Sequence, residues 1–593
     1  MDSARPPSWA DRSRGILEGL RQQEDQLSLV LSLVIGALVG LVVVAFILLT
    51  GRLASRMYPA GGAGLRRILV PVLGSLSTGY LLWRFFPNAR GSGIPQTKFA
   101  LFISDGRILF RTVLGKFFCC SASLASGIAL GREGPSVQVG AGIASVIARN
   151  LRLPPKLVKA LVPAGCAAAL AAAFNTPIAA VLFTLEEIMG DLHAAVLGSV
   201  VLSSATSWMV LHLLLGDDPL FHVSGYRLVN PAEFAAYAVL GVVGGLGSVC
   251  FVKLLLGLRA RFLRLPAWSV WLQPVAGGLT VGLIGYFVPE VLGVGYDHVE
   301  RVLNGDMVLR MTALFAVLKI FATAVCYASG NAGGIFGPAL FIGAMMGASI
   351  GGVAHSWFPG STAGPGAYAL VGMGTAFAGI VRTPLTSVIM IFEITRDYTI
   401  IVPLMISNLI AFFISQKLQK QPIYEALADQ EGVHLPSSGS RQQADRMQVS
   451  RAMRNARAAP PGMPIGAVLQ QMRDCSLDAW PIADAAGLLG MARSRDAEQA
   501  VDDGASHQRV AVILGDGHAG NQSPADVIPH VHPDHSFSLA LERMGSSGMN
   551  ILPVVSRANL RQLIGVIVLE DVLRAYGVAK PNDGAAPERG PAG

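Results

Sequence analysis

The feature that most limits how this chain can fold is its series of apolar segments long enough to cross a membrane. The first, from Leu27 to Thr50, contains no charged residue, and a helix of about 20 apolar residues spans the hydrocarbon core of a bilayer. Hydrophobic residues make up 52% of the chain and charged residues only 14%, which excludes a soluble enzyme of this length. The first segment is also too long for a cleaved signal peptide. We therefore expect an α-helical polytopic membrane protein with an N-terminal segment at residues 1–26. We place this segment in the cytosol, although the arginines on both sides of the first span do not settle the orientation.

Between residues 68 and 418 many of the apolar segments are short or interrupted by Gly and Pro. Such interruptions occur at residues 91–96, 174–177 and 333–338. Inside a membrane, irregular backbone persists only where it is buried in protein or lines an aqueous cavity. The broken helices therefore indicate a transport pathway.

The apolar region contains an internal repeat. Residues of the first half align with residues of the second at one constant offset, with no gap in the alignment. The matched residues are Gly165 with Gly372, Thr176-Pro177 with Thr383-Pro384, Val181 with Val388, and Glu186 with Glu393. Upstream, residues 131–135 align with residues 334–338. We place the two repeats at residues 27–215 and 216–430. Transporters built from repeats bind substrate near the midplane, between the N-termini of half-helices, although the sequence does not show whether this repeat is inverted.

The motif Gly131-Arg132-Glu133-Gly134-Pro135 is the strongest candidate for a site. Charged residues at membrane depth are costly and mark function. Proline is tolerated in a first helical turn, and a helix start directs unpaired amides toward an anion. Glu133, which aligns with Phe336, would act as a tethered anion. A simple ion pair with Arg132 is the weaker alternative, because adjacent helical residues do not face each other.

Two neighbouring acids behave differently in the repeat. Glu186 aligns with Glu393, whereas Glu187 aligns with Ile394. Glu186 is therefore interpreted as architectural, for example as a helix cap, and Glu187 as an additional acid about 100° away on the same helix. A structural role for Glu187 remains the alternative.

Beyond residue 430 the chain becomes polar. We expect a linker at 431–448, two soluble α/β units at 449–500 and 524–577, and a disordered tail at 578–593. The second unit includes a strand at 550–555. The net charge of +8 fits a membrane surface better than a nucleic acid, because no basic run is interleaved with aromatic residues.

With these motifs assembled, the chain resembles the CLC family of chloride channels and chloride/proton antiporters. The motifs Gly-Ser-Gly-Ile-Pro at 91–95, Gly-Arg-Glu-Gly-Pro at 131–135, Gly-Gly-Ile-Phe-x-Pro at 333–338 and the Tyr398 region occur in family order. The tail resembles a pair of CBS domains. The resemblance implies an inverted repeat of about 18 helices and a homodimer in which each subunit has its own pore. It also implies a cytosolic C-terminal domain and a multi-pass protein of the cell (inner) membrane.

The resemblance also implies roles for particular residues. The hydroxyls of Ser92 and Tyr398 and the amides of Ile335 and Phe336 would bind chloride, with Arg132 and Gly134 at the same site. Neutral donors replace the hydration shell without holding the anion too long. Ser92 could instead cap the next helix, and Tyr398 could be an interfacial anchor.

The resemblance also implies roles for two acids and one lysine of the membrane region. Glu133 resembles the gating glutamate, and Glu187 resembles the internal proton-transfer acid of the antiporters. Lys116 would supply positive potential, or would reach to an interface. In the tail, Asp496 and Asp571 stand where the ribose-binding Asp of CBS domains falls, but Arg493 and Val568 replace the usual Ser/Thr. Adenine-nucleotide binding is thus doubtful, and a dimer-stabilising tail is an equal alternative.

The function predicted from these residues is chloride/proton exchange. A passive voltage- or pH-gated chloride channel on the same fold is the alternative, and a CBS-regulated cation transporter is a weaker one, because the polar donors are hydroxyls and amides. An enzyme is not expected, since no nucleophile and base occur at a suitable spacing. We expect no cofactor and no metal, with chloride as the substrate.

Overall fold

The computed structural model describes residues 24–59, 64–192, 196–217, 219–221, 229–433, 447–455, 458–475, 477–514 and 528–575. The chain divides into two compact units, Met1–Leu435 and Pro436–Gly593. Most of the expected N-terminal segment (1–26), most of the linker (431–448) and the tail (578–593) lie outside the described residues, and residues 24–26 already belong to the first helix.

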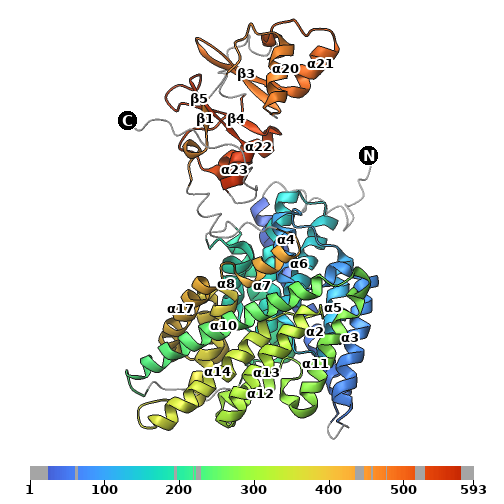
Figure 1. Cartoon of the computed structure of the whole chain (residues 1–593), viewed down its shortest axis with the longest axis vertical. Coiled ribbons are helices and arrows are strands. Elements are labelled where there is room, and N and C mark those ends of the chain that lie inside the picture. Colours follow the sequence, from blue (N-terminus) through green and yellow to red (C-terminus); the bar gives the residue numbers. More distant parts are fainter. Residues whose placement is uncertain are drawn as a thin grey trace, which may run out of the picture. The chain divides into compact units, whose positions relative to one another are not determined.

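The first unit is helical (Figure 1). Its first repeat comprises α2 (Glu24–Met57), α3 (Arg66–Arg84), η1 (Pro87–Ala89), α4 (Ile94–Phe102), α5 (Phe110–Ala125), α6 (Glu133–Asn150), α7 (Pro155–Phe174), α8 (Pro177–Phe183), the π-helical turn η2 (Thr184–Met189) and α9 (Leu197–Leu215). Its second repeat comprises α10 (Glu233–Leu263), η3 (Ala267–Trp271), α11 (Gln273–Phe287), η4 (Pro289–Val291), α12 (Tyr296–Leu303), α13 (Leu309–Ala328), α14 (Phe336–Trp357), α15 (Pro365–Val381), α16 (Pro384–Thr395), η5 (Tyr398–Ile400), α17 (Ile401–Leu418) and α18 (Ile423–Gln430).

Seven helices among the described residues are long and apolar enough to cross a membrane. The others are shorter or carry Gly and Pro at their ends, as the interrupted segments predict. Long apolar helices such as α2 and α10 expose Leu and Val along their outer faces, which suits a lipid environment.

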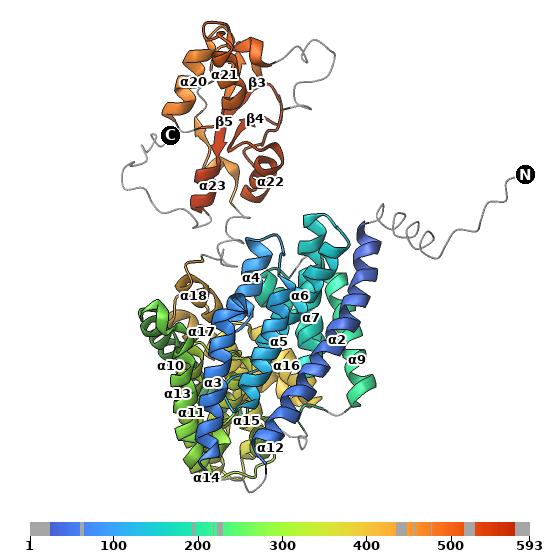
Figure 2. The ribbon, with the colours of Figure 1, turned by 90° about the vertical axis from the view of Figure 1, so that its right-hand side faces the viewer.

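The helices pack as two related sets. In the first repeat α2 packs against α9, α6 against α7, and α7 against α9 (Figure 2). In the second repeat α10 packs against α17, α14 against α15, and α15 against α17. The helix α3 of the first repeat packs along α11 of the second. The structure therefore confirms the repeat that the sequence predicts.

Two reciprocal contacts relate the halves. Gly131 and Gly334 exchange a pair of backbone hydrogen bonds, both 2.7 Å between nitrogen and oxygen. Glu186 accepts hydrogen bonds from the backbone amide (2.8 Å) and hydroxyl (2.6 Å) of Thr386 at the start of α16. In return, Glu393 of α16 accepts the amide of Ala179 (2.7 Å) at the start of α8. An exchange in which each half caps the other indicates a two-fold relation between the halves, as in an inverted repeat.

The pair α14 and α15 packs through small residues. A Cβ atom on Gly343 would overlap with the carbonyl oxygen of Gly372, and the first repeat contains the same close approach between Gly140 and Gly165. Small residues let helix backbones approach closely in membranes, where dispersion contacts replace the hydrophobic effect.

Gly343→Ala should therefore lower the thermal stability of the protein, because the added methyl group meets backbone that must move. Overpacking of this kind costs about 1–3 kcal/mol. The measurement is the midpoint of thermal unfolding in detergent. Gly257→Ala in α10 is the matched control, since a Cβ there meets no described atom within 4 Å. Equal midpoints for the two variants would contradict the packing argument.

The second unit contains two small sheets. The strands β1 (Arg454–Asn455), β5 (Leu563–Val568) and β4 (Ile551–Val555) form one sheet in that order, and β2 (Ala479–Asp484) pairs with β3 (Gly487–Arg493) in the other. All of these pairs are antiparallel. The remaining elements are η6 (Val449–Arg451), α20 (Ile465–Asp474), α21 (Ser494–Asp502), η7 (Val510–Leu514), α22 (Phe537–Ser547) and α23 (Leu569–Ala575).

The two halves of this unit share one order of elements, helix, strand, strand, helix: α20-β2-β3-α21 and α22-β4-β5-α23. Each half has its own hydrophobic core. The expected tandem α/β architecture is thus present, including the strand predicted near residue 551.

Candidate anion site

Three chain segments that carry the sequence motifs meet in the first unit. They are the turn that contains Ser92, the N-terminus of α6 and the N-terminus of α14. A Cβ on Gly134 would lie 2.6 Å from the carbonyl oxygen of Ser92, so glycine is required for this approach. Gly93 has a φ of 101°, a backbone conformation that residues with a Cβ atom rarely adopt. The motif glycines therefore bring the segments together.

Glu133 is fully buried at the first position of α6. Its Oε2 accepts a hydrogen bond from the amide of Gly337 (3.1 Å) in the first turn of α14. Its Oε1 accepts one from the hydroxyl of Tyr296 on α12. These contacts are not those of a simple ion pair with Arg132. The guanidinium of Arg132 instead lies over the Tyr296 ring, 5.6 Å from the ring centroid. The carboxylate occupies the place that an anion would take at the helix start.

Ile335 and Phe336 stand at the N-cap and first position of α14. The first amides of a helix have no acceptor within the helix. The Phe336 ring is turned into an aromatic cluster, with its centroid 4.3 Å from that of Phe377 and 4.6 Å from that of Phe174. The ring therefore packs in the core while the backbone supplies the polar groups.

Several buried hydroxyls have no hydrogen-bond partner among the described residues, and two of them, Ser92 Oγ and the Tyr424 hydroxyl, belong to the segments that meet here. The helix α18, which carries Tyr424, packs against α4, which begins just after Ser92. Because the Ser92 hydroxyl makes no cap bond, the helix-cap alternative does not hold. Buried hydroxyls are normally satisfied, so these two are the candidates to face an anion.

The assignment of Tyr398 to this site is wrong. Tyr398 begins η5 before α17 and is 74% exposed, so it cannot coordinate a dehydrated anion beside Ser92. The buried tyrosine at the end of the second repeat is Tyr424. Both tyrosines follow the last Gly-containing motifs, and order along the chain does not distinguish them.

Lys116 is fully buried and donates to the carbonyl oxygens of Ala89 (3.0 Å) and Gly91 (2.6 Å). It therefore does not reach to an interface. Lys319, at the matching position of the second repeat, donates to Val291 (3.0 Å) and Gly293 (2.6 Å). Each lysine fixes the turn that precedes a short helix, and Lys116 places its charge next to the Ser92 turn.

Glu186 and Glu187 point to different partners, as their positions in the repeat predict. Glu186 caps α16 and is architectural. The Oε1 atom of Glu187 lies 2.8 Å from the Nζ atom of Lys98 on α4, with both side chains nearly inaccessible. Both acids belong to the π-helical turn η2, a rare form that is frequently found at functional sites. Tyr424 lies near both Glu187 and Glu133.

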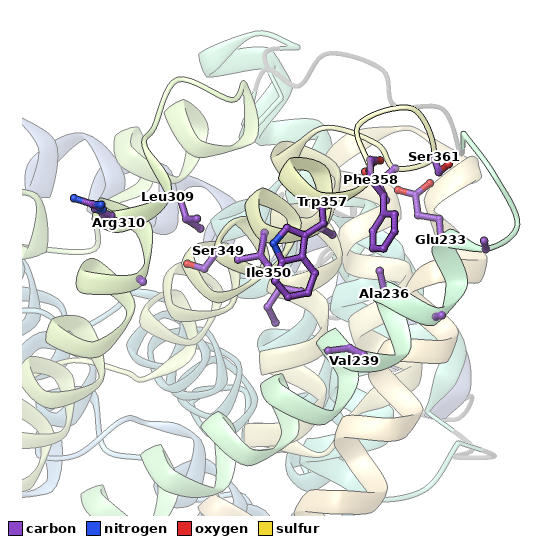
Figure 3. Close-up of a pocket in the computed structure, with 16 residues that line it drawn as sticks. Glu233, Ala236, Val239, Leu309, Arg310, Ser349, Ile350, Trp357, Phe358 and Ser361 are labelled. Atoms are coloured by element: carbon purple, nitrogen blue, oxygen red, sulfur yellow. The ribbon is translucent and has the colours of Figure 1, made fainter.

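Two cavities differ in character. One of about 510 Å³ is lined by polar groups that include Arg90, Arg107 and Glu431, beside the turn that carries Ser92. The other, of about 880 Å³, lies between α10, α13 and α14 and is mostly apolar, with Trp357 and Glu233 in its lining (Figure 3). It contains none of the candidate site residues.

Comparison with known proteins decides the family. A family model described as "Voltage gated chloride channel" matches residues 74–416, more than half of the chain. The protein belongs to this family.

Relatives of this CLC protein include exchangers and channels by name. The "H(+)/Cl(-) exchange transporter ClcA" of Vibrio cholerae serotype O1 (strain M66-2) is 34% identical over 354 residues, which cover 59% of this chain and 76% of that protein. The "Putative chloride channel protein ClcB-like" of Ralstonia nicotianae is 32% identical over 381 residues, covering 63% of this chain and 89% of that one.

Solved structures of CLC transporters have a similar fold. A slow cyanobacterial Cl⁻/H⁺ antiporter has a TM-score of 0.63 and 26% identity, covering 68% of this chain and 97% of that one. A eukaryotic CLC transporter has a TM-score of 0.64 over 93% of this chain and 98% of its own, and at 21% identity it shows the fold alone. The family and the polytopic membrane fold that the motifs predict are confirmed.

The tail of this CLC protein contains a CBS domain, matched by its family model at residues 525–578. The first half of the tail has the same order of elements, and its assignment as a CBS domain at 449–500 stays a prediction. Asp571 forms a bidentate ion pair with Arg454 on β1 (2.6 and 2.9 Å). Asp496 lies exposed at the start of α21.

Three residues around the site were not predicted from the sequence. They are Lys98, Tyr296 and Tyr424. Lys98 had a usable signal, because it is a charge in an apolar segment three residues after the first motif. Tyr296 could have been found by aligning the turn at 293–295 with the turn at 91–93. Tyr424 had no signal beyond its apolar neighbours.

Proposed function

We propose that this protein exchanges chloride for protons across a membrane. The observation that supports this most directly is the position of the Glu133 carboxylate, which accepts the Gly337 amide at the start of α14. A carboxylate held by helix-terminal amides competes with chloride for the same donors. The relative from Vibrio cholerae carries the name of such an exchanger.

Chloride binding would use groups that are neutral. The hydroxyls of Ser92 and Tyr424 and the amides of Ile335 and Phe336 replace hydration without a fixed cation in contact, so the ion can leave. Gly134 supplies the close approach of α6, and Arg132, stacked on Tyr296, and Lys116 contribute positive potential. An arriving chloride displaces the Glu133 side chain, which then takes up a proton.

The proton would pass between Glu133 and Glu187. These acids lie on different elements, α6 and η2, and Tyr424 lies near both. Lys98 holds Glu187 by a buried ion pair, which fixes the acid in place between transfers. Water must bridge the remaining distance, because no direct bond joins the two acids among the described contacts.

Access to the site from one side is supported by the polar cavity beside the Ser92 turn. Arg90 and Arg107 in its lining favour anions, while Glu431 offsets part of that charge. Clefts with an excess of one sign of charge raise the local concentration of the opposite ion.

The assembly we propose is a homodimer in which each subunit has its own pathway, as the resemblance to the family implies. The tail would be cytosolic and the protein would lie in the cell (inner) membrane. Because Asp571 is engaged by Arg454, a structural role for the tail is favoured over binding of an adenine nucleotide.

The test is proton movement in sealed vesicles that contain the purified protein. An imposed chloride gradient should drive protons against their own gradient, at a rate that depends on protein content. The control is protein-free vesicles with a protonophore added at the end to report the remaining gradient. Chloride flux without uphill proton movement would indicate the passive channel instead.

A further inference from the structure

Glu133 is held by the opposite repeat at both carboxylate oxygens. Oε2 takes the Gly337 amide, and Oε1 takes the hydroxyl of Tyr296, the first residue of α12. The first donor is backbone and belongs to the helix start. The second is a side chain, so its contribution can vary independently of the fold.

Tyr296 is itself fixed from several sides. The guanidinium of Arg132 lies over its ring, and Phe221 meets the ring edge-on, with centroids 5.6 Å apart. Gly295, with a φ of 84°, precedes it, and Lys319 ties down the turn through the carbonyl of Gly293. The direction of the hydroxyl is therefore set before Glu133 arrives.

The repeat shows that this hydroxyl is not needed to build the turn. In the first repeat the corresponding turn ends at Gly93, is held by Lys116 in the same way, and is followed by Ile94. The second repeat builds the same turn and helix start with Tyr296 in the place of Ile94. The tyrosine thus adds a hydrogen-bond donor to an architecture that an aliphatic residue also satisfies.

We propose that Tyr296 is a positioning residue that retains the ionised Glu133 in the anion site and so sets how readily Glu133 takes up a proton and leaves. This rests on the proposed gating role of Glu133. A hydroxyl stabilises a carboxylate more than a neutral carboxylic acid.

The test is Tyr296→Phe in reconstituted vesicles, with chloride turnover and proton coupling measured across a range of pH. Loss of a hydrogen bond to the ionised form should shift the pH profile of turnover by about one to two units toward higher pH. Other titratable or charged groups around this contact are Cys120 on α5, Arg132 before α6, Lys319 on α13 and Tyr424 on α18. None of them is altered by the substitution.

Tyr237→Phe is the matched control. Tyr237 is also buried, and its hydroxyl also donates to a buried carboxylate, Glu233 (3.3 Å), next to the apolar cavity rather than the anion site. This variant should keep the wild-type pH profile. A shift of equal size in both variants would show a general effect of losing a buried hydroxyl and would overturn the proposal.

A second background separates this inference from the proposed function. In Glu133→Ala no acceptor remains, so adding Tyr296→Phe should leave chloride turnover unchanged, and retained turnover also shows that the double variant folds. If Glu133→Ala keeps normal proton coupling, the gating role fails. If Glu133→Ala uncouples but Tyr296→Phe keeps the wild-type profile, or acts equally in the Ala background, the role of Tyr296 fails.

Discussion

Glu133→Gln should keep chloride movement and abolish both its pH dependence and its coupling to protons. The glutamine has no proton to exchange, and a group that transfers protons contributes about 10²- to 10⁴-fold to rate, so proton flux should fall at least about a hundredfold. Its amide also cannot replace the carboxylate: Gly337 and Tyr296 both donate to Glu133, and one of them would face an NH₂ group. The neutral side chain therefore leaves the donors to chloride. The measurement is paired chloride and proton flux in vesicles.

The matched control for this prediction is Glu233→Gln. Glu233 is buried and accepts a backbone amide, that of Ala363 (2.7 Å), and the hydroxyl of Tyr237, so its bonding is similar to that of Glu133 at a place away from the anion site. Its substitution should leave coupling intact. Persistent coupling in Glu133→Gln would assign the gate to another residue.

Glu187→Gln should stop proton transport and spare chloride, because chloride binds to hydroxyls and amides on other segments. The expected loss of proton flux is again at least about a hundredfold. The substitution also removes one charge of the buried pair with Lys98, which destabilises a protein by about 3–5 kcal/mol when the other charge is left uncompensated. Flux and thermal stability are therefore measured on the same preparation.

A second variant distinguishes the two effects of that substitution. Lys98→Met with Glu187→Gln removes the unpaired charge and should recover much of the lost stability without recovering proton flux. Recovery of proton flux together with stability would mean that Glu187 is only the structural partner of Lys98, and that the internal proton acid is a different residue.

Much of this arrangement could be predicted because it depends on backbone features that leave a mark in the sequence. The glycines and prolines of the 131–135 and 334–338 motifs identified two helix starts, and the structure joins them through Gly131 and Gly334. Glu186 has a glutamate as its counterpart in the second repeat and Glu187 does not. This difference predicted that Glu186 is a helix cap and Glu187 an additional acid. Repeats make such comparisons possible, since one half serves as a reference for the other.

The residues that were missed act through side chains whose direction depends on tertiary packing. Tyr424 and Tyr398 look equivalent in the sequence, and only burial distinguishes them. Lys98 is four helical positions into α4, and its partner Glu187 comes from a distant segment. Tyr296 reaches Glu133 across the repeats, a contact that no local pattern encodes.

The reciprocal caps have a consequence for biosynthesis. The ribosome completes residues 27–215 well before Glu393 is synthesised, so the amides at the start of α8 lack their cap until then. Glu186 likewise has no Thr386 to bind until the second half is made. Neither half can finish alone. During synthesis these helix starts therefore depend on water or other transient acceptors until the second half is in place, and a chain truncated between the two halves should be less stable than the full chain.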